Sequence, residues 1–235
     1  MPPPYSRRNF LLTGAAALGG ALLTHSRQTG AWGAERGKSA AGMTLGYSLY
    51  GMKSLSLDAA LAACAKIGYD AVELAVMPDW PASPASLSSA DRRQLRERLK
   101  ELGLSLPALM ENLNLGVDDA ADRGQLDRLK AAAELAHDLV PDQPPLIETV
   151  VGGKAGQWPE VGERFAKRLA GWVRVAEQTK TVLAIKPHRF GAMNTPADAV
   201  ALAKQIDSPY LKLAYDYSHF QFRDLPLSET LQQML

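Results

Sequence analysis

Short apolar runs alternate with longer segments of helical periodicity from residue 43 to the end of the chain. Regular alternation of this kind is typical of βα units that build a parallel sheet. The apolar runs predict six strands, at residues 43–50, 70–74, 104–109, 145–153, 182–187 and 210–216. Apolar side chains that recur every three or four residues predict helices over about 57–67, 91–103, 125–139, 160–179, a segment from 196, and 228–235.

The predicted helix boundaries carry capping signals. Ser56 precedes the first helix and Gly68 follows it, in the positions favoured for an N-cap and a C-cap. Ser88 with Asp91 three residues later resembles a capping box. Thr195 is followed by proline, the preferred order at the start of a helix. The predicted helices are therefore supported by local chemistry as well as by periodicity.

Two architectures accept this alternation, an open doubly wound sheet and a (β/α)₈ barrel. A dinucleotide-binding sheet would show a G-x-G-x-x-G turn after its first strand, where this chain offers only Gly51. Polar residues gather after the strands instead, as the active-site face of a barrel requires. The pattern favours an α/β (β/α)₈ TIM barrel.

Six strands do not close an eight-stranded barrel, and an open sheet would expose two edges. We therefore expect the barrel to be truncated after about six βα units, as in a fragment or a shortened reading frame. The alternatives are a natural half-open domain and a domain that a partner chain completes.

Charge is distributed unevenly along the chain. Residues 1–34 contain Arg7, Arg8 and Arg27 and no acidic residue. The rest of the chain therefore contains 23 of the 26 basic residues and all 25 acidic residues. This balance predicts no nucleic-acid partner, because such a partner needs a basic face. The single cysteine, Cys64, excludes an internal disulfide and a Cys-rich zinc site, and its apolar neighbours favour a packing role.

The segment "SRRNFLLTGAAALGGALL", residues 6–23, resembles the twin-arginine (Tat) export signal. It joins two arginines and Phe-Leu to a mildly apolar run that is short for a membrane span, although an uncleaved anchor is the alternative. The resemblance implies passage through the Tat machinery and a periplasmic or other extracytoplasmic location without a stable membrane span. We expect residues 1–41 to be signal and linker and 42–235 to be the folded domain.

Candidate chemistry stands at the ends of the predicted strands. In a barrel these positions meet at one mouth although they are far apart in the sequence. The chemically competent side chains there are Glu73, Glu111, Asn112, Glu148, Lys186, His188, Asp216 and His219. Their convergence would supply the acids, bases and cations that catalysis needs.

The stretch "YDYSHF" places Asp216 three residues before His219. Such a pair can hold a divalent metal together with a substrate hydroxyl, or orient an acid/base pair. The plainer interpretation is that Asp216 caps a turn and His219 is an ordinary loop residue. The stretch "KPHR", residues 186–189, ends the preceding strand and favours the catalytic interpretation over a solvated basic loop.

The stretch "IGYDAVEL", residues 67–74, and residues 195–220 resemble the xylose isomerase-like TIM barrels, the sugar phosphate isomerase/epimerase superfamily that also includes endonuclease IV. The resemblance covers about residues 44–235. It implies a divalent metal bound by a Glu ending strand five, the Asp of strand six, a His of strand seven and a Glu of strand eight. It also implies proton transfer at carbons next to a carbonyl or hydroxyl, often through an enediolate-like intermediate.

By this resemblance Asp216 matches the strand-six metal ligand and His219 the histidine that contacts substrate. Glu73 matches the strand-two Glu, a site-facing or structural position. Lys186 departs from the pattern, because it stands where the metal-binding Glu is expected and an ammonium cannot ligate a metal. One divalent ion (Mn, Mg or Zn) is therefore expected only in a longer form of the chain that supplies further ligands.

The leading hypothesis is an exported, carbohydrate-acting enzyme of the isomerase, epimerase or lyase type. Lys186 would stabilise a developing enolate or act as a base, while His188 and His219 would shuttle protons. The expected substrate-binding residues are Glu73, Glu148 and Arg189, and the aromatic residues that could stack on a sugar are Tyr47, Trp80 and Trp158.

Two other functions compete with this hypothesis. The first is a non-catalytic periplasmic sugar-binding barrel, or an inactive fragment without the metal site, which Lys186 at the Glu position favours. The second is phosphodiester cleavage of the endonuclease IV type. It needs a cluster of metal-binding His and Glu residues that four histidines, one of them in the leader, hardly supply.

Overall fold

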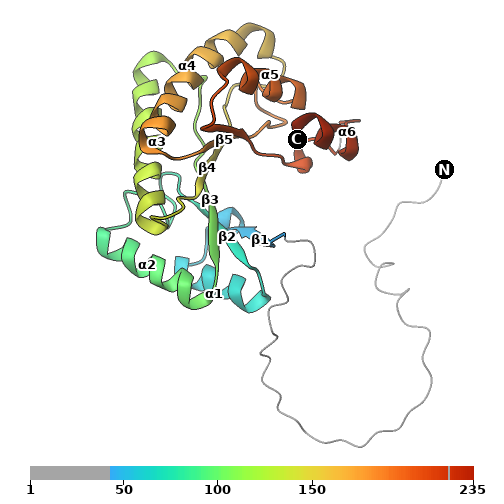
Figure 1. Ribbon diagram of the computed structural model, residues 1–235. Coiled ribbons are helices and arrows are strands. Elements are labelled where there is room, and N and C mark those ends of the chain that lie inside the picture. The colour runs from blue at the N-terminus through green and yellow to red at the C-terminus, as the bar shows by residue number, and fades with distance from the viewer. Residues whose placement is uncertain (1–42, 222) are drawn as a thin grey trace, which may run out of the picture. The chain divides into compact units, whose positions relative to one another are not determined.

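The computed structural model describes residues 43–221 and 223–235, and the predicted export signal lies outside this part of the chain. One parallel sheet has the order β1-β2-β3-β4-β5-β6 (Figure 1). The strands are β1 (Gly46–Ser48), β2 (Ala71–Ala75), β3 (Ser105–Met110), β4 (Leu146–Thr149), β5 (Leu183–Ile185) and β6 (Leu211–Leu213). All six predicted strands are present, most of them shorter than predicted.

The helices follow the strands in sequence, as βα units require. They are α1 (Leu57–Ile67), α2 (Ser89–Leu102), α3 (Asp119–Leu139), α4 (Trp158–Thr179), α5 (Pro196–Ile206) and α6 (Leu227–Met234). Two 3₁₀ helices, η1 (Leu49–Met52) and η2 (Tyr217–His219), follow β1 and β6. In the described part of the chain, none of the helices has the length and apolar character needed to cross a membrane.

The predicted caps form, and they explain where the helices begin. The Ser56 hydroxyl accepts the Ala59 N–H, and Ser88 and Asp91 make both hydrogen bonds of a capping box. The Thr195 hydroxyl accepts the Asp198 N–H at the start of α5. Each such cap is worth about 1 kcal/mol of stability. Local sequence signals are therefore sufficient to place these helix ends.

The start of α3 differs from its prediction, which placed it at residue 125. Asp118 caps the helix by accepting the Ala121 N–H, and Asp119 and Asp122 in the first turn complement the helix dipole. Residues 119–124 contain two aspartates, two alanines, an arginine and Gly124, so this segment shows no apolar periodicity. Capping and charge, not burial, begin the helix here.

The main core lies between the outer face of the sheet and the helices that cover it (Figure 1). Strand β2 is almost fully buried along its length, as expected for a parallel strand with both faces covered. The largest fully buried side chains include Trp172, Phe165, Leu61, Leu74, Leu109, Leu135 and Ile147. This packing makes the sheet a firm support for the loops that follow its strands.

Strand register gathers polar side chains on the opposite, inner face. Glu148 of β4 pairs with Ala184 of β5, and Lys186 follows Ala184 by two residues, so all three share a face. Glu73 of β2 pairs with Ala108 of β3, whose partner on β4 is Leu146, two residues before Glu148. Alternation of side chains along the strands thus brings distant charged residues to one side of the sheet.

Candidate active site

A cavity of about 990 Å³ opens at the carboxyl ends of the strands. In (β/α) barrels this end of the sheet carries the active site. The polar side chains that line the cavity include Glu73, Asn112, Glu148, Lys186, His188, Asp216 and His219. Most of the residues that the sequence analysis selected therefore do lie around one space.

Lys186 occupies the centre of the charged groups. Its ammonium Nζ lies 3.1 Å from Oε1 of Glu148 and 3.7 Å from Oδ2 of Asp216. The Lys186 N–H donates to the carbonyl oxygen of Thr149, which fixes the backbone beyond the end of β5. The lysine thus bridges carboxylates that come from the two neighbouring strands.

Glu148 is a buried carboxylate on β4. Burial raises the pKa of Glu148 above its usual value, and the nearby charge of Glu73 adds to the rise. The charge of Lys186 acts in the opposite direction and favours the ionised form. The ammonium is therefore the partner that compensates for the burial of this acid.

Asp216 serves two purposes at the start of η2. Its Oδ1 accepts the Ser218 N–H at 3.0 Å and the Ser218 hydroxyl at 2.6 Å, so Asp216 does cap the turn. Its Oδ2 faces Lys186 and lies 3.5 Å from Nε2 of His219. Burial acts to raise the pKa of Asp216, but the Ser218 hydrogen bonds and the charges of His219 and Lys186 outweigh it and lower the pKa. Asp216 is thus an anion with one oxygen anchored and the other turned to the site.

His188 and His219 form a pair on the cavity wall, with ring centroids 4.2 Å apart. Burial lowers the pKa of His188, and the charges of His219, Lys186 and Arg189 lower it further. Burial also lowers the pKa of His219, although Asp216 opposes the shift. Both rings are consequently neutral at pH 7.

Polar contacts indicate which ring nitrogen of each histidine carries the proton. Nδ1 of His188 accepts the Phe190 N–H at 3.3 Å, which leaves Nε2 to carry the proton of the neutral ring. In His219 the Nε2 atom faces the Asp216 carboxylate. Nδ1 of His219 is buried and has no hydrogen-bond partner within the described residues. The lone pair of this nitrogen is therefore not engaged.

The loop that carries His188 is held by the loop after β4. Gly152 and Gly153 adopt φ angles of +75° and +74°, which side chains disfavour. The Ala192 N–H donates to the Gly152 carbonyl oxygen at 3.0 Å, and a Cβ on Gly153 would lie 2.6 Å from Cβ of Ala192. The two glycines thus permit a close approach that places the histidine loop.

Two of the selected side chains lie elsewhere. Arg189 is exposed, with its guanidinium 4.6 Å from the Phe190 ring centroid, and it does not line the cavity. Glu111 is buried and forms an ion pair with Arg128, so its carboxylate is already engaged. Substrate binding by Arg189 stays a prediction that the geometry does not support.

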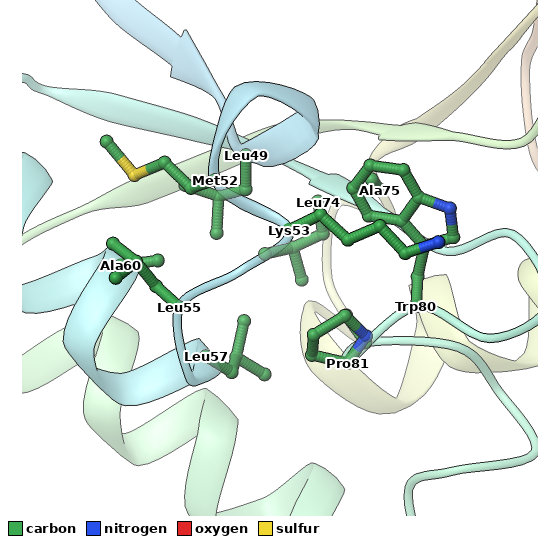
Figure 2. A pocket seen from close by; sticks show the side chains of 11 residues that line it. Leu49, Met52, Lys53, Leu55, Leu57, Ala60, Leu74, Ala75, Trp80 and Pro81 are labelled. Atoms are coloured by element: carbon green, nitrogen blue, oxygen red, sulfur yellow. The ribbon is translucent and has the colours of Figure 1, made fainter.

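The aromatic candidates divide in the same way. Tyr47 lines the cavity, whereas Trp80 lies beside a separate apolar hollow of about 20 Å³ with Lys53 over its ring (Figure 2). Trp80 stacks on Tyr50 with ring centroids 5.1 Å apart, and Tyr50 does line the cavity. Trp80 therefore does not face the cavity but packs against Tyr50, which lines it.

The third aromatic candidate is a packing residue. Trp158 packs edge-on against Phe165, with ring centroids 6.3 Å apart, next to the main core. Sequence reasoning also missed two useful residues, Tyr50 and Ser218. The apolar pattern predicts a strand through Tyr50, and only Ser48, the N-cap of η1, indicates the turn that brings Tyr50 to the cavity. Ser218 follows Asp216 at the spacing of an Asx turn, which could have revealed it.

The donor set does not fit the divalent metal that the family resemblance implies. The positions of the strand-five and strand-six ligands hold Lys186 and Asp216, and the Lys186 ammonium has no lone pair and repels a cation. Across residues 43–221 and 223–235, no group of three or more His, Cys, Asp or Glu side chains is placed to hold one ion.

Comparison with known proteins confirms the fold. The family described as xylose isomerase-like TIM barrel matches residues 61–234. A xylose isomerase-like TIM barrel protein from Mycobacterium smegmatis, solved in complex with magnesium, is 17% identical, with a TM-score of 0.64 over 83% of this chain and 72% of that one. No curated protein sequence gives a significant match.

Two further solved structures are similar. D-psicose 3-epimerase, solved in the presence of D-fructose, is 19% identical with a TM-score of 0.63, over 82% of this chain and 70% of that one. The IOLI protein with a bound zinc atom is 17% identical with a TM-score of 0.64, over 80% and 67%. At these identities the likeness establishes the α/β barrel fold that the strand and helix pattern predicted.

Proposed function

Because the chain belongs to the xylose isomerase-like TIM barrel family, we propose that it is an isomerase- or epimerase-type enzyme acting on a small carbohydrate. The observation that carries the proposal is the pair of neutral imidazoles, His188 and His219, on the wall of a cavity at the strand ends. The similarity to a D-psicose 3-epimerase supports a sugar as the substrate class.

The proposed reaction is proton transfer at the carbon next to a carbonyl group. An imidazole of the pair takes the proton from this carbon, and the electrons of the C–H bond form a C=C bond. The carbonyl π electrons move to oxygen, which gives an enolate. An isomerisation is complete when the proton returns to the former carbonyl carbon and the hydroxyl proton of the neighbouring carbon passes to the enolate oxygen. An epimerisation is complete when a proton is delivered to the opposite face of the original carbon. Asp216 orients His219 for this task through the 3.5 Å contact with Nε2.

The charges of the cavity favour an uncharged sugar. Glu73, Glu148 and Asp216 line it, and the ammonium of Lys186 is already paired with two of them. An additional anionic group on the substrate would meet net negative charge. Carboxylates accept hydrogen bonds from sugar hydroxyls, and the Tyr50 ring offers a face to an apolar side of the sugar.

Solvent isotope exchange tests the proposal. The full chain is incubated with a panel of neutral ketoses and aldoses in D₂O, and proton NMR follows each C–H position next to the carbonyl. We expect one sugar to lose the proton signal at that carbon and to yield a product labelled there with deuterium. A panel that shows binding by calorimetry without any exchange would contradict the proposal.

That negative outcome corresponds to the competing function, a sugar-binding barrel without catalysis. The presence of Lys186 in place of the metal-binding Glu favours it. The two functions differ in one observable. An isomerase exchanges the proton next to the carbonyl with solvent deuterium, whereas a binding protein leaves that proton in place.

Export remains part of the proposal. The twin-arginine resemblance of residues 6–23 supports passage through the Tat machinery to an extracytoplasmic location. We expect the joint change Arg7→Lys and Arg8→Lys to retain the protein inside the cell, as judged by fractionation and immunoblotting. Lys38→Arg outside the motif serves as the control. Equal export of the double variant would contradict this proposal.

A further inference from the structure

We infer that the Lys186 ammonium is the resident cation of this cavity and that it binds the substrate carbonyl oxygen in place of a divalent metal ion. The inference rests on the proposed function for its catalytic part, because it names the group that stabilises the enolate. Its metal-binding part stands on the geometry of Lys186, Glu148 and Asp216 alone.

The three groups come from neighbouring strands in a fixed order. Glu148 lies on β4, Lys186 follows β5 and Asp216 follows β6, so the cation stands between two anions. The side chains of Glu148 and Lys186 are 7% and 15% exposed, and that of Asp216 is 34% exposed. The cation is therefore largely shielded from water yet still borders the cavity.

The Asp216 carboxylate is held in place by contacts other than the one with Lys186. Oδ1 of Asp216 accepts two hydrogen bonds from Ser218, which turns Oδ2 toward Lys186. Strand pairing fixes the backbone of Glu148, and the carboxylate of this residue contacts Lys186. An ammonium carries three N–H donors, so two contacts with carboxylates leave one donor for a substrate oxygen. The site thus presents a preorganised positive donor.

This donor completes the proposed reaction. When an imidazole removes the proton from carbon, negative charge develops on the carbonyl oxygen. The free N–H of Lys186 donates a hydrogen bond to that oxygen and stabilises the enolate electrostatically. The proton then returns from the imidazole to the former carbonyl carbon, the hydroxyl proton of the neighbouring carbon passes to the enolate oxygen, and a C=O bond forms at that neighbouring carbon. Every proton and electron pair is accounted for by the substrate and the side chains.

The same geometry makes a prediction about metal affinity. In the wild-type chain the positive charge at residue 186 repels a divalent ion from Glu148 and Asp216. The substitution Lys186→Glu removes this charge and places a third carboxylate between the other two. Three carboxylates together with water satisfy the preference of Mn²⁺ for oxygen ligands. The substitution should therefore create a metal site.

The experiment titrates Mn²⁺ into the full chain and follows the free ion by its electron paramagnetic resonance signal. We expect no loss of free-ion signal with the wild type and loss of one equivalent per chain with Lys186→Glu. The double change Lys186→Glu and Glu148→Gln should abolish the gain. The matched control is Lys167→Glu on the exposed surface of α4, which should bind no Mn²⁺.

Binding of one Mn²⁺ by the wild type, lost on Asp216→Asn, would overturn the inference. A folded Lys186→Glu variant that binds no ion would overturn it too, because the carboxylates would not then surround a cation position. Circular dichroism verifies the fold of that variant. If it does not fold, the wild-type titration and its Asp216→Asn counterpart decide the question.

A second arm tests the catalytic part of the inference. If a sugar from the isotope panel is exchanged, Lys186→Gln should lower kcat for that exchange by about 10²–10³-fold. Lys186→Arg keeps the positive charge and should recover part of the loss, which a purely structural role would not require. Unchanged kcat in Lys186→Gln would contradict this part. Absence of exchange in the wild type would count against the proposed function and leave the metal result intact.

Discussion

Replacement of either histidine of the pair by glutamine is expected to lower kcat for proton exchange by about 10²–10⁴-fold, the usual contribution of general acid–base catalysis. Glutamine preserves the approximate size and polarity of the ring but cannot take up a proton. His188→Gln and His219→Gln should leave substrate affinity close to that of the wild type, since both rings are proposed to act on the proton. Initial rates of deuterium incorporation, measured by NMR over a range of sugar concentrations, separate kcat from KM.

The chain offers a matched control for these substitutions. His137 lies on α3, outside the cavity, and its Nε2 contacts the Thr179 carbonyl oxygen at 2.7 Å. His137→Gln should therefore leave kcat unchanged. If both cavity variants kept wild-type kcat, the imidazole pair would not be the proton-transfer group, and the proposed mechanism would fail.

The substitution Trp172→Ala is expected to lower the free energy of unfolding by about 3–5 kcal/mol. Trp172 is fully buried on α4, in the layer between that helix and the sheet. Truncation removes the largest buried side chain of the core and leaves a cavity that its rigid neighbours fill only in part. Urea unfolding followed by circular dichroism measures the loss.

Trp172→Phe provides the comparison for this prediction. Nε1 of Trp172 is buried and has no hydrogen-bond partner within the described residues. Phenylalanine keeps one aromatic ring and removes this unpaired donor, so it should cost clearly less than alanine. If the two variants lost the same free energy of unfolding, the ring that phenylalanine retains would contribute nothing to stability at this position, and the prediction would be wrong.

Much of the fold could be predicted because its signals are local. Ser88 and Asp91 satisfy each other within one turn, so sequence alone places the start of α2. The prediction failed where a local polar interaction replaces burial. Asp118 begins α3 in a segment without apolar periodicity, and Ser48 turns the end of a predicted strand into η1. The second case also concealed Tyr50 at the cavity.

The candidate site could be predicted only in outline. The rule that the ends of parallel strands meet at one edge brought Glu73, Glu148, Lys186 and Asp216 together. It could not show that the lysine lies between two acids, because this depends on strand register and side-chain conformation.

The same limit applies to the loop after β5. Arg189 is adjacent to His188 in the sequence but points to the surface, where it lies over Phe190. Sequence distance therefore does not tell which of two neighbouring side chains enters the cavity.

The most direct test of the account is the rate of deuterium exchange by wild-type protein that has been stripped of metal with a chelator. Because the His188 and His219 pair is proposed to move the proton and Lys186 to stabilise the enolate charge, we expect the same rate before and after stripping. Added Mn²⁺ should leave that rate unchanged. Loss of exchange on stripping, with recovery on addition of Mn²⁺, would contradict the account.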